Sequence, residues 1–394
     1  MKFINQNMII VQKFGGTSVG SLEKIKHSAS IVKKSILQNK KIVVVVSAIA
    51  GQTDELMSKF ASITNNSILD KSLLAERDSV VSTGEQVCAG LFAGYLRTIG
   101  VNARSFNGFQ AGIFTDRNFS NAKIKEINID LIKKCLELNM TPVITGFQGY
   151  CLKQNRSTTL GRGGSDTSAI AIAAALKAEK CEIYKDVDGI LTGEPKIIKN
   201  YKKIDNLEYS RMIEFSSSGA KVIETRAVQF GAKYNIPINV LSTFSNSTGT
   251  LITNEINEKA KITGVSLSSN NLLFVLISTI PLKKEIQNIE DQFPIYKILS
   301  IESLQQNQNK FTILLPSTER NNIPNHIQIK IISITGYFLK SDKILNKVIN
   351  LLDDFEIKQI SITATETKIS IIVPFNANNE IADKIHQELL LNKN

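Results

Sequence analysis

The chain of 394 residues has few cysteines and few histidines. Its four cysteines are widely spaced and form no CxxC pair. This spacing argues against a disulfide framework and favours reduced thiols in a core. The three histidines, His27, His326 and His386, are scattered without the spacing of metal ligands. We therefore expect neither a metal site built from protein side chains nor a histidine general base.

The sequence also lacks a long hydrophobic run. The N-terminal stretch MKFINQNMIIVQKFGG has one short apolar segment, far shorter than a membrane span or the core of a signal peptide. We therefore expect a soluble, cytoplasmic protein without a membrane partner. The formal net charge is +11, but the lysines are spread among asparagines and isoleucines instead of clustering with aromatics. Compositional bias explains this charge better than a nucleic-acid partner, which we do not expect.

Alternating strand and helix patterns fill the first part of the chain. Residues 9–14 and 42–46 are short apolar runs typical of buried strands, and apolar residues recur at helical spacing between residues 22 and 36. This alternation predicts an α/β fold in which helices cover a mostly parallel sheet. Further strands are expected at residues 141–145, 182–184 and 238–241, and further helices at residues 127–138, 167–178 and 218–234.

The pattern changes to shorter units after Thr250. The polar residues 254–261 mark the expected boundary, and the tail has the pattern of two small βαββαβ modules. The chain is long enough for two or three domains. Strands are expected at residues 262–267, 272–278, 310–315, 327–334, 360–363 and 368–373, with a helix at residues 344–355.

The first candidate site is the sequence KFGGTS at residues 13–18, where a predicted strand ends and a helix is about to begin. Glycines there leave backbone N–H groups accessible to phosphate oxygens, and Lys13 supplies a positive charge. The sequence is not a P-loop, and two glycines after a strand are also common at plain turns. Alone, this motif is only a weak indication of phosphate binding.

The second candidate site is TLGRGGSDTS at residues 159–168, which leads into an alanine-rich helix. Its three glycines, with Ser165 or Asp166 as the N-cap, predict an anion site with a fixed carboxylate beside it. Arg162 has the planar group that a two-point contact with a carboxylate requires, which a lysine lacks.

The third candidate site is IYKDVDG at residues 183–189, at the end of a predicted strand. Ligands of α/β sheets bind at this end of the strands. Asp186 and Asp188 are therefore candidates to hold a nucleotide or its Mg²⁺. A simple Asp-Gly turn is a second interpretation of the same residues.

Eight segments together resemble the aspartate kinases, which belong to the amino-acid kinases. They are, in order, KFGGTSV, SAIAGQTDEL, VVSTGEQ, FQAGIFTD, TGFQG, TTLGRGGSDTSA, EIYKDVDGILT and GAKVIETRAV, and they cover roughly residues 9 to 252. The resemblance implies an α/β/α sandwich that transfers the γ-phosphate of Mg·ATP to the β-carboxylate of L-aspartate. The product would be 4-phospho-L-aspartate, at the first step of lysine/diaminopimelate, threonine and methionine biosynthesis.

The same resemblance assigns roles to matching positions. It implies that Lys13 and Asp166 are catalytic, with Asp166 orienting the lysine, and that Glu85 takes the α-ammonium group of aspartate. Ser47, Thr53, Glu85 and Arg162 would bind the substrate. The residues implied to bind ATP are Lys13, Phe14, Gly15, Gly16, Gly163, Gly164, Ser165, Lys185, Asp186, Leu191, Lys196, Lys221 and Val222.

Three positions depart from the family pattern. Lys185 stands where the family usually has a small hydroxyl residue, Leu191 where a tyrosine is common, and Lys196 where an arginine is common. These departures concern nucleotide affinity more than the chemistry.

The C-terminal region resembles the paired ACT modules of the family, which bind regulatory amino acids and dimerise. The expected organisation is a catalytic domain at residues 1–253, a degenerate ACT-like module at residues 262–325 and an ACT-like module at residues 326–394, joined in a homodimer. The glycine and proline turn that normally precedes the ACT helix is replaced by residues 337–344, YFLKSDKI. We therefore expect little or no response to lysine or threonine.

Two alternatives stay open on sequence alone. One is another amino-acid kinase acting on glutamate, N-acetylglutamate or carbamate. The other is a catalytically inactive, amino-acid-binding regulator.

Overall fold

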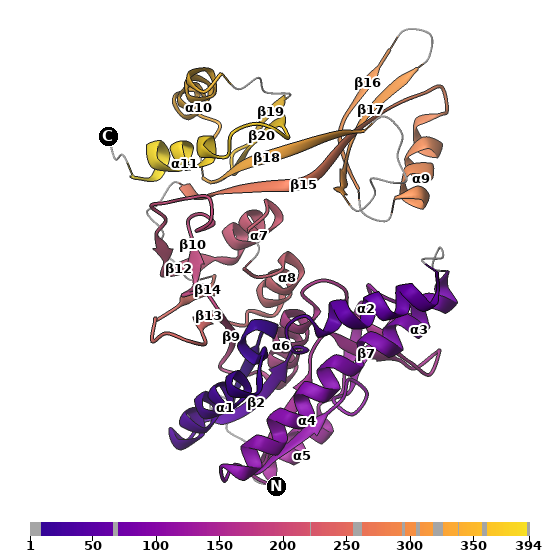
Figure 1. Cartoon of the computed structure of the whole chain (residues 1–394), viewed down its shortest axis with the longest axis vertical. Helices are drawn as coiled ribbons and strands as arrows, with labels where there is room; N and C mark the ends of the chain where they lie inside the picture. Colours follow the sequence, from indigo (N-terminus) through magenta and orange to yellow (C-terminus); the bar gives the residue numbers. More distant parts are fainter. Residues whose placement is uncertain are drawn as a thin grey trace. The chain divides into compact units, whose positions relative to one another are not determined.

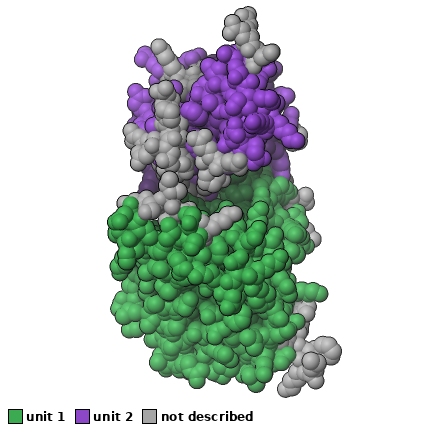
Figure 2. All heavy atoms as spheres, turned by 90° about the vertical axis from the view of Figure 1, so that its right-hand side faces the viewer, with its two compact units in different colours: residues 1–191, 203–217, 221–258 green, residues 192–202, 218–220, 259–394 purple. Residues whose placement is uncertain are grey.

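The computed structural model describes residues 9–65, 70–220, 222–254, 262–293, 296–304, 308–317, 326–337, 339–356 and 361–391. The chain forms two compact units, coloured separately in Figure 2. The first comprises Met1–Leu191, Lys203–Ser217 and Lys221–Glu258, and the second comprises Thr192–Lys202, Ser218–Ala220 and Lys259–Asn394.

The first unit is built on an eight-stranded sheet with the order β12-β14-β13-β9-β1-β2-β6-β3 (Figure 1). All neighbouring strands pair in parallel except β13 and β14, which are antiparallel. The strands are β1 (Ile9–Phe14), β2 (Lys41–Val46), β3 (Ala103–Phe106), β6 (Thr141–Thr145), β9 (Lys180–Lys185), β12 (Asn206–Glu208), β13 (Ile238–Ser242) and β14 (Thr250–Thr253).

The central strands β1 and β2 are buried along almost their whole length because helices cover both faces of the sheet. On one face, α1 (Leu22–Leu37) and α4 (Thr83–Thr98) share a core with β1 and β2. On the other face, α6 (Gly164–Leu176) packs against β1, β2 and β9. The predicted α/β/α sandwich is therefore confirmed.

The remaining elements of this unit surround the sheet. A small four-stranded sheet has the order β5-β4-β7-β8, and β10 pairs with β11. The strands are β4 (Ile113–Thr115), β5 (Ile124–Ile127), β7 (Gln148–Cys151), β8 (Arg156–Thr159), β10 (Ile190–Leu191) and β11 (Lys203–Ile204); the helices are α2 (Gln52–Ile63), α3 (Lys71–Val81), α5 (Asp130–Glu137), α7 (Tyr209–Ser217) and α8 (Thr225–Tyr234).

The predicted helix at residues 218–234 is wrong in its first part. α7 ends at Ser217, and Gly219 has a φ of +111°, a backbone conformation that no α-helix contains. A new helix, α8, begins only at Thr225. The helix predicted at residues 127–138 likewise starts later, at Asp130, because β5 extends to Ile127.

The second unit contains a six-stranded sheet with the order β16-β17-β15-β18-β20-β19, antiparallel throughout. The two strands predicted at residues 262–267 and 272–278 are one strand, β15, with a register shift between Ser268 and Asn271. Such a bulge interrupts the alternation of side chains, which explains why the sequence pattern breaks there. The other elements are β16 (Lys297–Ser303), β17 (Asn309–Pro316), β18 (Ile327–Gly336), β19 (Ser361–Ala364), β20 (Lys368–Pro374), α9 (Leu282–Gln292), α10 (Asp342–Asp354) and α11 (Glu380–His386), with β15 at Ile262–Ser278.

β15 contributes to two apolar cores in this unit. Its first half places Val265 in a core with residues of β18, α10 and α11, and its second half places Leu272 in a core with α9 and β17. The antiparallel sheet with these helices agrees with ACT-like modules.

Segment Thr192–Lys202 is hydrogen-bonded to α11. Asp383 accepts a hydrogen bond from Lys199 N, and His386 Nε2 lies 2.8 Å from Thr192 Oγ1.

All four cysteines are unpaired and buried, as predicted. No helix in the described part of the chain is both long enough and apolar enough to cross a membrane.

Candidate active site

The ends of three neighbouring strands, β1, β2 and β9, meet at one edge of the large sheet. Phe14, the last residue of β1, lies opposite Val46 of β2 and Tyr184 of β9. The hydrogen bonding continues past the strands, because Gly15 N–H donates to Tyr184 O and Ser47 N–H donates to Phe14 O, each at 3.1 Å. β1 lies between β2 and β9, where the order of strands reverses, and α/β sheets bind their ligands at such a point.

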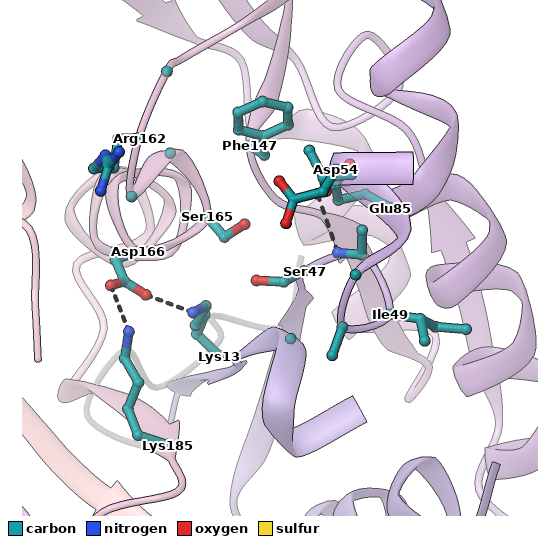
Figure 3. A pocket seen from close by; sticks show the side chains of 18 residues that line it. Lys13, Ser47, Ile49, Asp54, Glu85, Phe147, Arg162, Ser165, Asp166 and Lys185 are labelled. Atoms are coloured by element: carbon teal, nitrogen blue, oxygen red, sulfur yellow. Dashed lines mark hydrogen bonds and ion pairs between the residues drawn. The ribbon is translucent and has the colours of Figure 1, made fainter. Parts of the chain in front are cut away.

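A pocket of about 320 Å³ opens at this edge (Figure 3), which is a size typical of small-molecule sites. It combines residues from all three candidate motifs. Asp54 and Phe147 also line it and were not predicted. The predicted residues that line it are Lys13, Gly16, Ser47, Thr53, Glu85, Arg162, Gly163, Gly164, Ser165, Asp166 and Lys185.

One side of the pocket holds two lysines on one carboxylate. Lys13 Nζ lies 2.6 Å from Asp166 Oδ1, and Lys185 Nζ lies 3.0 Å from Asp166 Oδ2. The side chains of Lys13 and Asp166 are only 4% and 3% exposed, whereas that of Lys185 is 20% exposed. Both carboxylate oxygens of Asp166 are therefore engaged by ammonium groups.

These contacts set the charges of the three groups. Burial would raise the pKa of Asp166, but the charges of Lys13 and Lys185 outweigh it and hold this pKa at about 2. Burial lowers the pKa of Lys13 to about 8; the ion pair with Asp166 opposes this shift, and the charge of Lys185 adds to it. At neutral pH Asp166 is therefore ionised and most of Lys13 is protonated.

The opposite side of the pocket is acidic. Glu85, in the first turn of α4, is 2% exposed, and its Oε1 accepts a hydrogen bond from Ala48 N–H at 3.1 Å. Its Oε2 is buried and has no hydrogen-bond partner among the residues that the structure describes. Burial raises the pKa of Glu85 to about 8. Figure 3 shows Asp54 beside Glu85, and the hydroxyl groups of Ser47 and Ser165 between the two sides.

The glycine-rich turn forms the rim at the N-terminus of α6. Gly163 has a φ of +64°, and a Cβ there would lie 1.8 Å from Glu224 Cγ, so no other residue fits. The N–H groups of a first helical turn have no partner within the helix and attract anions. Arg162 is exposed at the pocket and makes no hydrogen bond or ion pair with any described residue.

Two residues that the motifs did not reveal fix this turn. Asp78 of α3, which is fully buried, accepts four hydrogen bonds: from N–H and Oγ of Ser120, and from N–H and Oγ1 of Thr159, at 2.7–2.9 Å. Arg226 of α8 donates to Leu160 O at 3.0 Å. The residues immediately before Gly161 are therefore held from both sides.

The other predicted nucleotide contacts do not line the pocket. Phe14 is fully buried against Phe92 and Tyr184, and the N–H of Gly15 is used in the sheet. Asp186 is exposed after β9. Leu191 lies in β10, Lys196 is exposed in the second unit, Val222 is half-buried before α8, and Lys221 lies outside the described residues.

The described residues at this pocket do not form a set of protein ligands for a divalent metal ion. The described residues contain no group of three or more His, Cys, Asp or Glu side chains that could hold a metal ion. Both oxygens of Asp166 already contact lysines, and Asp188 accepts a hydrogen bond from Ser245. The donor set therefore fits Mg²⁺ carried by nucleotide phosphates, which is the usual arrangement for this ion.

The fold and the pocket define a small-molecule kinase of the amino-acid kinase type. The model of the amino acid kinase family matches residues 8–242. The chain is 40% identical to an aspartokinase of Rickettsia felis over 95% of its own length and 96% of that protein. It is 33% identical to an aspartokinase of Geobacillus stearothermophilus, covering 96% of each chain.

A solved structure agrees with these relatives. The crystal structure of E. coli aspartokinase III in complex with aspartate and ADP matches with a TM-score of 0.79 and 25% identity, covering 97% of this chain and 100% of that one. The chain therefore belongs to the amino acid kinase family and, within it, to the aspartokinases.

Proposed function

We propose that this protein transfers the γ-phosphate of Mg·ATP to the β-carboxylate of L-aspartate and forms 4-phospho-L-aspartate. The observation that carries the proposal is the placing of two ammonium groups, those of Lys13 and Lys185, on one side of a pocket and the carboxyl group of Glu85 on the other. A ligand that bears both an ammonium group and a carboxylate to be phosphorylated matches this arrangement.

Aspartate binds with its α-ammonium group on Glu85. Glu85 Oε2 is buried without a partner among the described residues, and a buried carboxylate oxygen is costly unless a ligand contacts it. Ser47, Thr53 and Arg162 line the same pocket and supply donors for the substrate carboxylates. The β-carboxylate is already ionised at neutral pH, so the reaction needs no general base.

Lys13 stabilises the phosphoryl group during its transfer. Phosphoryl transfer spreads negative charge over the phosphate oxygens, and fixed positive groups lower its barrier. Asp166 holds the ammonium of Lys13 in place at 2.6 Å, and the first turn of α6 adds the N–H donor of Ser165. Mg²⁺ bound to the nucleotide would neutralise further phosphate charge. Phe14, Gly15, Asp186, Leu191, Lys196, Lys221 and Val222 remain predicted nucleotide contacts.

The test is ATP consumption that depends on both L-aspartate and Mg²⁺, with hydroxylamine present to trap the acyl phosphate. Glutamate and N-acetylglutamate serve as control substrates. We expect aspartyl hydroxamate from L-aspartate alone. Hydroxamate from a control substrate would make the protein a different amino-acid kinase, and no turnover by folded protein would favour an inactive regulator.

We also propose that the second unit joins two copies of the chain through ACT-like modules, at residues 262–325 and 326–394, with the catalytic domain at residues 1–253. Side chains alternate across a strand, so the sheet face opposite α9 carries Leu273, Val275 and Ile277, of which the last two are 42% and 56% exposed. Light scattering is expected to give the mass of a dimer, and Ile277→Glu is expected to lower it. A monomer at all concentrations would contradict this arrangement.

A further inference from the structure

The cationic side of the pocket contains two lysines, Lys13 and Lys185, but only one carboxylate, that of Asp166, to balance them. Lys13 comes from β1 and Lys185 from the end of β9, the neighbouring strand. Each contacts a different oxygen of the single carboxylate of Asp166. Two ammonium groups on one carboxylate leave a net charge of about +1 at a largely buried position, which is unfavourable unless an anion joins them.

Lys185 is also placed to reach a ligand. Its side chain lines the pocket and is 20% exposed, compared with 4% for Lys13. Gly15 lies beside both lysines, since a Cβ there would be in van der Waals contact with Lys13 Nζ at 3.5 Å and with Lys185 Cδ at 3.8 Å. Figure 3 shows both ammonium groups directed to Asp166 on the same side of the pocket.

A purely structural role explains these observations less well. Asp166 already has Lys13 at 2.6 Å and lies in the first turn of α6, where the helix dipole stabilises a carboxylate. A second lysine is therefore unnecessary to balance Asp166. Aspartate kinases usually carry a small hydroxyl residue at this position, and such a residue could not reach Asp166 as an ion pair.

We propose that Lys185 is a second phosphate-binding catalytic residue of this chain. Its ammonium group, held by Asp166, contacts oxygens of the β- and γ-phosphates of ATP and shares with Lys13 the charge of the phosphoryl group in transfer. This inference rests on the proposed kinase activity. It assigns to the chain a phosphate contact that the usual hydroxyl residue cannot supply as a charge.

The test compares Lys185→Met with Lys180→Met. Methionine keeps a long apolar side chain and removes the charge. Lys180 is a matched control, because it lies at the other end of β9 and pairs with Glu182 at 2.8 Å.

Calorimetric titration with ATP, ADP and AMP measures affinity without turnover. For Lys185→Met we expect an ATP affinity about 10- to 100-fold weaker, as for loss of a charged hydrogen bond, with AMP affinity unchanged. Lys180→Met is expected to bind all three like the wild type.

A second readout separates contact with phosphate from positioning through Asp166. The charge of Lys185 lowers the pKa of Lys13, so its removal is expected to move the alkaline limb of the kcat profile to higher pH. Lys185→Arg is expected to recover part of the ATP affinity, because it restores the charge. A Lys185→Met variant that loses kcat but keeps wild-type ATP affinity would overturn the proposal and leave Lys185 as a positioning residue.

The outcomes also separate this inference from the proposed function. Aspartyl hydroxamate from the wild type, with ATP affinity unchanged in Lys185→Met, would reject only the role of Lys185. ATP affinity that depends on Lys185, in a wild type that forms no hydroxamate, would reject only the proposed reaction. Should Lys185→Met fail to fold, Lys185→Ser carries the same comparison, because serine resembles the usual residue of the family.

Discussion

The pocket of the first unit and the turn between β18 and α10 in the second unit differ in what fills them. In the pocket, Glu85 Oε2 is buried without a partner among the described residues, and two lysines share Asp166. At the turn, Leu339 is fully buried in the core below α10, and its N–H donates to Glu366 O at 3.0 Å.

The difference shows where ligand binding is retained. Unpaired buried polar groups and unbalanced charge cost free energy, so where they line a pocket they indicate a ligand that completes them. A turn closed by an apolar side chain and a backbone hydrogen bond is complete without a ligand. We therefore expect changes in the pocket to have large effects on activity and effectors at the turn to have small ones.

The largest effect is expected from Lys13→Met, which removes the buried ammonium on Asp166. We expect kcat to fall by about 10²–10³-fold, the loss typical of one preorganised transition-state donor. The fold is expected to persist, since Lys185 still pairs with Asp166. Steady-state kinetics and thermal denaturation measure the two properties.

Lys40→Met is the control for Lys13→Met. Lys40 also pairs with a carboxylate, that of Glu179 at 2.7 Å, but it lies just before β2, at the opposite end of the sheet from the pocket. It is expected to keep full activity. Wild-type turnover in Lys13→Met would mean that the cationic side of the pocket does not act on the phosphoryl group.

Glu85→Gln is expected to weaken aspartate binding while ATP binding stays the same. Glutamine can still accept the hydrogen bond from Ala48 N–H, so the loop after β2 keeps its anchor. The KM for aspartate is expected to rise about 10- to 100-fold, which corresponds to loss of a hydrogen bond between charged groups. Preference for aspartate over succinate, which lacks the ammonium, should fall by the same factor. An equal preference in both proteins would refute the role of Glu85.

Asp78→Asn is expected to have a smaller effect, mainly on stability. An amide has one accepting oxygen, so two of the four donors on Asp78 would face an NH₂ group. The free energy of unfolding is expected to fall by about 1–3 kcal/mol, and kcat should fall as the loop at Gly161 shifts. Asp70→Asn in the same helix is the control, because asparagine is as good an N-cap as aspartate. Identical denaturation midpoints for both variants would exclude this anchor.

The sequence predicts the sheet of the first unit well because its strands are buried on both faces. A continuous β-branched run of this length, such as residues 42–46, favours a buried strand. Prediction fails where backbone geometry decides. Gly219 has a positive φ, so the first part of the helix predicted at residues 218–234 is not helical, and the bulge near Ser268 makes one strand resemble two. Neither conformation leaves a periodic pattern.

The candidate site was predictable where a motif lies at a strand end. Lys13 and Lys185 line one pocket because the parallel strands β1 and β9 place their carboxyl ends at one edge. Arg162 and Asp166 were indicated by the glycine-rich motif before α6, and Glu85 by the family resemblance alone. Asp78 was not predictable, since its partners Ser120 and Thr159 are 42 and 81 residues away and its own helix gives no motif. Such long-range polar contacts depend on the completed fold.

A further prediction concerns the proton that Glu85 carries. Burial raises the pKa of Glu85 to about 8, so this group is mostly protonated at pH 7 in the free protein. An ammonium ligand favours its ionised form, and aspartate binding at pH 7 is therefore expected to release up to about one proton. Release should decline above pH 8, where Glu85 is already ionised, and disappear in Glu85→Gln. Calorimetry in buffers of different ionisation enthalpy measures it; equal release by Glu85→Gln would assign the proton to another group.

The smallest effect on activity is expected from free lysine and free threonine, added as possible effectors. At the turn before α10, Leu339 is buried and contributes to a core with Val348 and Leu352, while Ser341 and Asp342 are exposed. An amino acid bound there would have to displace a packed leucine, and removing a leucine from such a core typically costs about 2–5 kcal/mol. Each effector, titrated into an aspartate-saturated assay and into a calorimeter, is therefore expected to give neither inhibition nor heat. Saturable inhibition by either one would show that the second unit has kept a ligand site, and it would remove the contrast with the pocket.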